Sequence, residues 1–282
     1  MKRRTDSVRQ WLAALVLGLS ALLLAGCASD EKEAAYVERP VEDIYNEAMD
    51  YLEAGKYALA ASSFDEVERQ HPYSKWATKA QIMAAYTHYA SGKYDDAVVT
   101  LDRFIELHPG NDDVAYAYYL KGLSYYEQIS DVARDQRMTE NALKTFTDLV
   151  RRFPDTDYAR DAQLKVDLAY DHLAGKDMNV GRYYLRAGHE LAAIGRFRRV
   201  IEKYGTTTHV PEALHRLTEA YLALGVIEEA RYTAAVLRHN YADSDWYKDS
   251  WALLDKQDLL TAEERGLSQT AGVPDETNSG TN

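Results

Sequence analysis

Cysteine is nearly absent from the sequence, which contains Cys27 and no other thiol among its 282 residues. A chain with one thiol forms no internal disulfide, no CxxC redox pair and no cysteine-based metal site. The nucleophile motif GxSxG and the zinc motif HExxH are also missing. Two of the eight histidines, His71 and His108, hold equivalent places 37 residues apart, so repetition explains them better than a shared ion. The sequence therefore predicts a protein that is not an enzyme and has no metal or cofactor.

Long hydrophobic runs are also scarce, and the one near the N-terminus extends only from Trp11 to Leu24. Fourteen helical residues rise about 21 Å, which is less than the roughly 30 Å of a hydrocarbon core. Four basic residues precede the run and small residues follow it, which is typical of a secretory signal. We therefore expect an export signal here and not a permanent transmembrane helix.

The signal ends in Leu24-Ala25-Gly26-Cys27, which resembles the bacterial lipobox. In such signals the chain is cut before the cysteine and the thiol is acylated. The resemblance implies that residues 1–26 are removed and that Cys27 is the lipidation site, anchored stably by several acyl chains. Ala28 is not the aspartate that usually retains such proteins on the inner membrane, so the outer membrane is expected, on its periplasmic face.

Acidic residues outnumber basic ones, 45 to 33, and the imbalance grows when the signal is removed. The signal takes four basic residues and one acidic residue with it, leaving 29 against 44 and a net charge of −15. Nucleic acid is therefore not expected as a partner. Residues 27–40 are polar and predict a flexible tether between lipid and fold. Residues 243–282 form a C-terminal extension that we expect to be largely disordered after 256.

Between tether and tail the hydrophobic positions follow helical spacing, and two short motifs repeat. Gly55-Lys56-Tyr57 returns as Gly92-Lys93-Tyr94, and His71-Pro72 returns as His108-Pro109, each 37 residues later. A helix, a glycine turn, a second helix and a proline stop are the order of a tetratricopeptide repeat. The spacing therefore predicts stacked helix pairs.

Aligning the repeats at their small and aromatic positions predicts an all-α fold of five tetratricopeptide repeats stacked in a right-handed superhelix. Repeats one and two are expected in 41–112, repeat three in 113–156, and repeats four and five in 157–242. Repeat three carries eight extra residues, expected as a loop at 128–138. Residues 157–174 are expected to lengthen the first helix of repeat four, with a possible kink at Gly175.

The 22 tyrosines have two interpretations. Those at recurring repeat positions are expected to be core residues, whereas the dense run between Tyr116 and Tyr126 cannot fit on one helix face. Aromatic side chains on a concave surface suit an extended peptide, because they provide contact area at low entropic cost. The density of aromatic residues beside the repeat turns predicts a peptide site that comprises Tyr51, Tyr57, Trp76, Tyr86 and Tyr119.

Arginines gather between 182 and 199 in an otherwise acidic chain. Such a run is either a solvated face or a docking patch for an acidic partner, where guanidinium groups set orientation. Arg196, beside Phe197, is the best candidate for an anchor. The predicted partner-binding residues are Arg182, Arg186, Arg196, Phe197 and Arg199.

Four segments carry a closer resemblance, because they include turns between repeats that the generic repeat does not dictate. They are His71-Pro72-Tyr73-Ser74-Lys75-Trp76-Ala77, Tyr119-Leu120-Lys121-Gly122-Leu123, Phe153-Pro154-Asp155-Thr156-Asp157-Tyr158-Ala159 and Arg182-Tyr183-Tyr184-Leu185 with Arg196-Phe197. With the lipobox, they resemble the BamD family of lipoproteins of the outer-membrane β-barrel assembly machinery.

This resemblance implies a non-enzymatic subunit that is anchored in outer-membrane lipid through acylated Cys27. It implies that the C-terminal repeats dock on the POTRA domains of the barrel-forming subunit, with Arg196 as a contact. It further implies binding of accessory assembly lipoproteins, and recognition of the C-terminal signal of unfolded outer-membrane proteins by the N-terminal repeats.

Two other classes of protein remain as alternatives. A periplasmic tetratricopeptide adaptor for division or peptidoglycan machinery would be expected to carry a coiled-coil segment, and no sustained heptad run is present. An enzyme on a helical-repeat scaffold, such as a lytic transglycosylase, would need a catalytic domain for which little chain remains outside the repeats.

Overall fold

The computed structural model describes residues 38–261 and 265, and a compact unit begins at Val41. The predicted signal, the lipidation site Cys27, most of the tether and most of the C-terminal tail lie outside the described residues, so they remain predictions. None of the helices in the described part of the chain combines the length and the apolar character needed to cross a bilayer.

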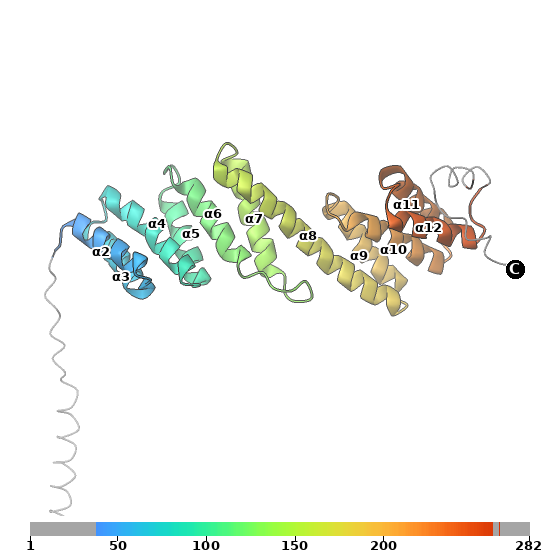
Figure 1. Ribbon diagram of the computed structural model, residues 1–282, viewed down its shortest axis with the longest axis horizontal. Helices are drawn as coiled ribbons and strands as arrows, with labels where there is room; N and C mark the ends of the chain where they lie inside the picture. The colour runs from blue at the N-terminus through green and yellow to red at the C-terminus, as the bar shows by residue number, and fades with distance from the viewer. Residues whose placement is uncertain (1–37, 262–264, 266–282) are drawn as a thin grey trace, which may run out of the picture. The chain divides into compact units, whose positions relative to one another are not determined.

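Eleven α-helices and no strand make up the described residues (Figure 1). They are α2 (Val41–Glu53), α3 (Tyr57–Gln70), α4 (Lys75–Ala90), α5 (Tyr94–Leu107), α6 (Val114–Tyr126), α7 (Arg137–Arg152), α8 (Asp157–Arg186), α9 (Glu190–Lys203), α10 (Val210–Ala223), α11 (Ile227–Asn240) and α12 (Asp245–Lys256). The prediction of an all-α fold of tetratricopeptide type is confirmed. The count of five repeats stays a prediction, with α2 to α11 as the five candidate pairs.

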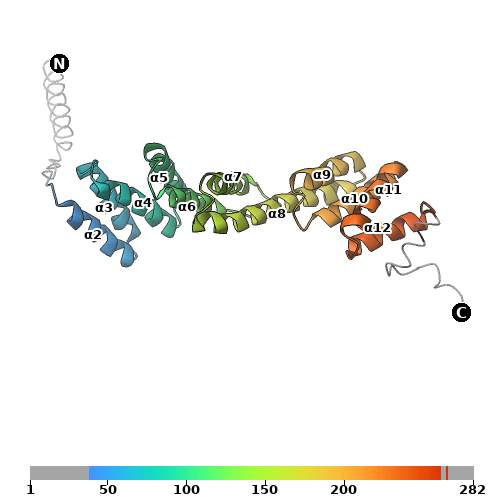
Figure 2. The same ribbon diagram turned by 90° about the horizontal axis from the view of Figure 1, so that it is seen from above.

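The helices lie in two rows (Figure 2). Each helix packs against the next one along the chain, and each even-numbered helix from α2 to α10 also contacts the next even-numbered helix. The even-numbered helices therefore form one continuous layer, and the odd-numbered helices α3 to α11 cover its other side. Side chains on the free face of the even layer can form a surface that runs across several repeats.

Glycine turns join the helices of four pairs, which explains the 37-residue spacing of the sequence motifs. Gly55, Gly92, Gly188 and Gly225 all have φ between +69° and +74°, a left-handed conformation that a Cβ atom disfavours. At Gly55, the next amide, Lys56 N–H, donates to the carbonyl of Tyr51 at 2.8 Å, and the other three turns repeat this bond. The bond satisfies a carbonyl at the helix end, as in a Schellman cap.

Three of the turns that precede an even-numbered helix have a second feature, a hydroxyl that caps that helix. The Ser74 side chain accepts a hydrogen bond from the amide of Ala77 at 3.1 Å, and Thr156 accepts one from Ala159 at 3.2 Å. Ser244 caps α12 in the same way. Because an N-cap residue satisfies an amide that the helix itself leaves open, these hydroxyls fix where α4, α8 and α12 begin.

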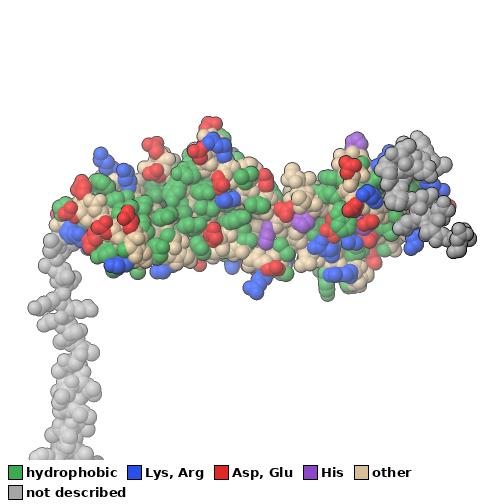
Figure 3. Space-filling view, in the orientation of Figure 1, with side chains coloured by type: hydrophobic (Ala, Val, Ile, Leu, Met, Phe, Trp, Pro, Cys, Tyr) green, Lys and Arg blue, Asp and Glu red, His purple; other side chains and the backbone are tan. Residues whose placement is uncertain are grey.

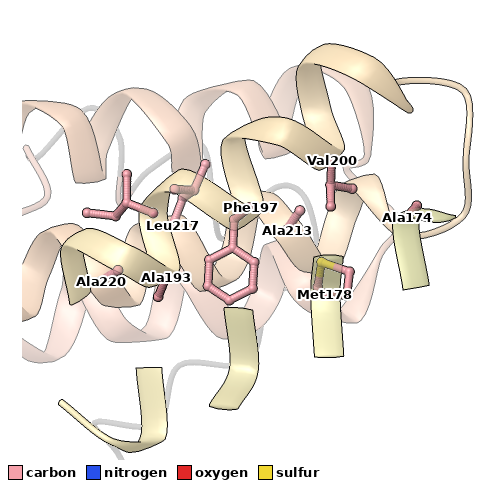
Figure 4. Packing of buried hydrophobic residues seen from close by; sticks show 9 residues of the cluster. Ala174, Met178, Ala193, Phe197, Val200, Ala213, Leu217 and Ala220 are labelled. Carbon is pink, nitrogen blue, oxygen red and sulfur yellow. The ribbon is translucent and has the colours of Figure 1, made fainter. Parts of the chain in front are cut away.

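Within a repeat, the two helices approach at a small residue that lies under an aromatic ring. Phe146 and Phe197 are fully buried, and so are Phe64 and Leu101 at the same repeat position. The Phe197 ring points from α9 toward α8 among Met178, Ala193 and Ala213 (Figure 4). A Cβ atom placed on Gly181 would lie 2.5 Å from Cε1 of Phe197, and one on Gly122 would lie 2.4 Å from Cε1 of Phe146. Glycine is therefore required at these two places by contact with the ring.

The longest helix, α8, has 30 residues and continues through Gly175 without interruption. Its first half packs on α7 and its second half on α9. Residues 127–136, the connection between α6 and α7, lie against the middle of α8 (Figure 1). His172 Nε2 is 2.9 Å from the carbonyl oxygen of Ser130, and Lys176 Nζ donates to the carbonyls of Ala133 at 2.8 Å and Arg134 at 3.3 Å. The loop is thereby held on α8.

We predict that Gly181→Ala destabilises the protein by about 1–3 kcal/mol, because the added methyl group overlaps the rigid Phe197 ring. Gly195→Ala in α9 is the matched control: its Cβ would meet no atom within 4 Å, so the change should stabilise the helix by about 0.5–1 kcal/mol. Chemical denaturation of the two variants measures both effects. Equal stability of the two variants would show that the glycine-ring contact does not limit helix approach.

Candidate functional site

The free face of the even-numbered helices carries a group of tyrosines that we call the aromatic surface. It comprises Tyr86 and Tyr89 of α4, Tyr116 and Tyr119 of α6, and Tyr158 of α8. The Tyr158 ring centroid lies 5.4 Å from that of Tyr116 and 5.4 Å from that of Tyr119. Figure 3 shows hydrophobic side chains gathered over this part of the molecule. Three successive repeats thus contribute rings to one exposed surface.

The apolar area continues along α8, where Leu164 and Leu168 are 63% and 56% exposed. These leucines are four residues apart and therefore lie on the same face of the helix. A contiguous exposed patch of this kind on a protein surface commonly marks a site of protein interaction.

A hydrogen-bonded carboxylate lies at the edge of the aromatic surface. The Tyr119 hydroxyl donates to Oδ2 of Asp161 at 2.6 Å, and Lys165 Nζ is 3.2 Å from the same oxygen. The hydrogen bond from Tyr119 lowers the pKa of Asp161 below its ordinary value, with Lys165 adding to the effect. Burial raises the pKa of the Tyr119 hydroxyl, and its bond to Asp161 raises that pKa further. Burial likewise raises the pKa of Tyr116 to about 12, so both hydroxyls are neutral donors at physiological pH.

The residues of the predicted peptide site fall into two groups. Tyr86 and Tyr119 are on the aromatic surface. Tyr51 and Trp76 instead pack at the edge of the first core cluster, where the Trp76 ring lies 4.8 Å from that of Tyr45. Tyr57 is 36% exposed at the start of α3, in the odd-numbered row.

Tyr89 and Tyr158 belong to the aromatic surface but were not predicted as site residues. Tyr89 follows Tyr86 by three residues on one helix, a spacing that places both on the same face, so helical periodicity could have found it. Tyr158 lies in a turn motif 39 residues after Tyr119, and only the packing of α6 on α8 brings the two together.

Two of the predicted partner-binding arginines converge on one buried carboxylate. Arg196 Nη1 donates to Oδ1 of Asp177 at 2.9 Å, and Arg199 Nη1 is 3.4 Å from the same oxygen. The Asp177 side chain is 7% exposed, whereas the Arg196 and Arg199 side chains are 35% and 45% exposed. A buried charge is stable only when it is paired, so Asp177 fixes the two guanidinium groups on the side of α9 that faces α8.

The other predicted arginines lie elsewhere. Arg182 donates to Oε2 of Glu212 on α10 at 2.8 Å, and Glu212 also accepts from Arg216. Arg186 and Arg198 are exposed and make no ion pair among the described residues. The predicted patch is therefore divided: Asp177 holds Arg196 and Arg199, Arg182 pairs with Glu212 of α10, and Arg186 is exposed at the end of α8.

Phe197 requires a correction. Its side chain is fully buried in the core between α8, α9 and α10, so it offers no surface to a partner in the folded protein. The sequence places it beside Arg196, but adjacent residues on a helix are about 100° apart around the axis, so one can face the core and the other solvent. Phe197 positions α9, and the arginines alone remain as candidate contacts.

A family model described as an outer membrane lipoprotein, YfiO, matches residues 37–237. A protein of Caulobacter vibrioides named outer membrane protein assembly factor BamD is 50% identical over 248 residues, which cover 87% of this chain and 81% of that protein. The chain belongs to the BamD family.

Two other members of the BamD family are similar over nearly all of their length. The Rickettsia prowazekii protein is 45% identical, with 86% of this chain and 95% of that protein covered. The protein of Neisseria meningitidis serogroup A is 32% identical, with 86% and 96% covered. Among solved structures, a tetratricopeptide protein of Thermus thermophilus superposes with a TM-score of 0.36 at 19% identity, covering 78% of this chain and 100% of that one. The helix pairing itself, and not this superposition, carries the fold assignment.

For this BamD-family chain we predict that Tyr119→Phe raises the pKa of Asp161 toward its ordinary value of 3.8, because the hydrogen bond that lowers it is lost. A lowered carboxyl pKa stabilises the folded state above the unfolded pKa, and this contribution disappears as the pH falls through the folded pKa. The variant should therefore be less stable than the wild type at neutral pH, with the difference vanishing in acid.

Carboxyl NMR titration reads the pKa of Asp161 directly. Tyr158→Phe is the control, because its hydroxyl makes no hydrogen bond to Asp161 among the described contacts. An unchanged Asp161 pKa in Tyr119→Phe would contradict the contact.

Proposed function

We propose that the protein is a non-catalytic lipoprotein subunit of the outer-membrane β-barrel assembly machinery, which scaffolds the complex and aids recognition and insertion of unfolded outer-membrane proteins. The observation that carries this proposal is the 50% identity, over 87% of the chain, to a protein named assembly factor BamD. The family description as an outer membrane lipoprotein supports the location. The lipobox at Cys27 supplies the anchor, with the folded part on the periplasmic face.

In this proposal the two surfaces have different partners. The arginine pair of α9 docks on the POTRA domains of the barrel-forming subunit, because guanidinium groups suit carboxylates on a protein surface. The aromatic surface binds the C-terminal signal of an unfolded outer-membrane protein. Its rings are supplied by α4, α6 and α8, so an extended segment can lie across three repeats and contact a ring in each. Accessory assembly lipoproteins are further partners.

Purification of the lipidated protein from outer-membrane extract in mild detergent tests the proposal. We expect a POTRA-bearing barrel protein to co-elute in near-stoichiometric amount. Recovery of division or peptidoglycan proteins in its place would favour the periplasmic adaptor.

We predict that Arg196→Glu weakens binding to the barrel-forming subunit by about 2 kcal/mol or more. The substitution removes a guanidinium donor and adds a negative charge that repels the carboxylates of the partner. Arg198→Glu is the matched control, since Arg198 is on the same helix, is exposed and has no ion-pair partner in the described structure. Isothermal titration with both variants, after thermal unfolding confirms that they fold, gives the comparison. If Arg196→Glu bound the barrel-forming subunit as tightly as the wild type does, the docking surface would lie away from Asp177 and α9.

For the aromatic surface, we predict that Tyr86→Ala combined with Tyr119→Ala weakens binding of a peptide with an outer-membrane-protein C-terminal signal by about 1–3 kcal/mol, because two contact rings are removed. Tyr232→Ala is the control, because Tyr232 is 71% exposed on α11, outside this surface. Fluorescence anisotropy of a labelled peptide measures the affinity. Unchanged binding in the folded double variant would show that the peptide lies elsewhere.

A further inference from the structure

The middle of α8 connects two halves of the fold. The N-terminal half comprises α2 to α7 with the start of α8, and its last core cluster includes Val166 of α8. The C-terminal half comprises the end of α8 with α9 to α12, and its first core cluster begins on α8 at Ala174. Because one helix belongs to both clusters, the surroundings of residues 167–176 decide whether the two halves move together.

The burial pattern shows that α8 is enclosed in this region. Leu173, Ala174 and Gly175 are buried in succession. A helix that packs along one stripe buries residues three or four positions apart, because successive residues are about 100° apart around the axis. Three buried residues in a row span about 200° of the circumference. Something other than a single neighbouring helix therefore covers α8 here.

One cover is the α6–α7 loop, residues 127–136, which belongs to the N-terminal half (Figure 1). His172 Nε2 and Lys176 Nζ contact three backbone carbonyl oxygens of this loop at 2.8–3.3 Å. The two side chains are four residues apart, so they lie on the same face of α8. The N-terminal half thus reaches past its own core cluster and holds α8 beyond Val166.

The loop is organised before it meets α8. The Gln136 side chain is 9% exposed, and its Nε2 donates to the carbonyls of Asp131, Val132 and Arg134 at 3.1–3.4 Å. Its Oε1 accepts a hydrogen bond from Thr139 of α7 at 3.1 Å. A buried amide that bonds on both sides holds the loop in one shape and ties it to α7.

The second cover is the turn between α9 and α10, which belongs to the C-terminal half. Oδ1 of Asp171 accepts hydrogen bonds from the hydroxyl of Thr208 at 2.9 Å and from its amide at 3.4 Å. Oδ2 of Asp171 lies 3.6 Å from Nε2 of His209. The C-terminal half therefore reaches back along α8, ahead of its own core cluster.

The two covers meet at Gly175. A Cβ atom on Gly175 would lie 3.3 Å from Nε2 of His209 in the turn and 3.6 Å from Cγ1 of Val132 in the loop. Gly175 is also four residues after Asp171 and three after His172, so it shares a face with both. Glycine favours a helix interior less than any residue except proline. The straight course of α8 thus passes through its weakest residue where the two covers close on it.

We propose that the α6–α7 loop and the α9–α10 turn form a clasp around the middle of α8, and that opening of this clasp lets α8 bend at Gly175. His172, Lys176 and Asp171 are the positioning residues of the clasp. It sets where the aromatic surface lies relative to the arginine pair of α9. The inference goes beyond the proposed function, because it does not depend on which partners occupy the two surfaces.

Distances between spin labels on the full-length lipidated protein in mild detergent test the proposal. With Cys27 acylated the chain has no other thiol, so introduced cysteines can be labelled selectively. Val99→Cys on α5 with Tyr232→Cys on α11 spans the two halves, whereas Val99→Cys with Leu59→Cys on α3 stays within one half. The three native side chains are 70%, 71% and 50% exposed, so labels there should not disturb the core.

We expect His172→Ala combined with Lys176→Ala to broaden the distance distribution of the spanning pair about twofold or more, because the loop is released. Asp171→Ala should broaden it from the other side. Asp167→Ala is the matched control, since Asp167 is exposed one turn earlier on α8 and its hydrogen bond comes from Gln163 of the same helix. The control, and the label pair within one half, should keep the wild-type width.

The position of the bend has a separate test. Adding Gly175→Ala to the double variant of the loop contacts should narrow the distribution again, because alanine favours the helix. An unchanged width would place the bend away from Gly175 and overturn that part of the proposal.

Three other outcomes would overturn the clasp itself. If the spanning pair keeps its wild-type width in variants whose thermal unfolding shows lost stability, α8 stays straight without the clasp. If the pair within one half broadens as much as the spanning pair, the substitutions loosen the whole fold. If Asp167→Ala broadens the distribution equally, the effect does not come from the loop or the turn.

Discussion

The close approach of two helices across a residue with little or no side chain is the constraint on which the fold depends. At Gly122 and Gly181 the facing phenylalanine ring fills the space where a Cβ would be. Ala48 and Ala85, at the same repeat position, are completely buried, as are Phe64 and Leu101 opposite them. Four of the helix pairs share this arrangement, and the pairs stack so that the even-numbered helices form one continuous layer.

Two departures from the generic repeat lie beside the proposed binding surfaces. The α6–α7 connection and the additional turns of α8 have no counterpart in the generic repeat, and the two compensate each other. The lengthened α8 moves α9 away from α7, and the longer loop covers the helix surface that would otherwise be bare, through the bonds of His172 and Lys176. The remaining opening is a cleft of about 560 Å³, lined by the loop, α8 and α9. The same extension places Tyr158 beside Tyr119, so it also contributes to the aromatic surface.

Much of the fold could be predicted from the sequence because its determinants are local. A left-handed glycine, a capping hydroxyl and an apolar period each act within a few residues, so the turns at Gly55 and Gly92 and the all-α class followed directly. The candidate surfaces depend on contacts between distant residues and were predicted only in part. Asp177 lies 19 residues before Arg196, and nothing in the sequence marks it as the counter-ion that separates Arg196 and Arg199 from Arg182. Phe197 was misplaced because sequence proximity to an arginine says nothing about which side of a helix a residue faces.

Because α8 is one continuous helix, it fixes the angle around its axis between the residues at its start and those in its second half. Each residue of an α-helix advances the chain by about 100° around its axis and about 1.5 Å along it. An insertion or deletion of one residue in the middle of α8 would therefore swing Asp177 and everything after it by more than a quarter of a turn about the axis of that helix, relative to Tyr158 and the helices before it. Loops elsewhere in the chain can gain or lose a residue without this rotation, because a flexible turn can change its conformation to accommodate the difference. The number of residues between Tyr158 and Asp177 thus determines the angle around the α8 axis between the aromatic surface and the arginine pair that Asp177 holds.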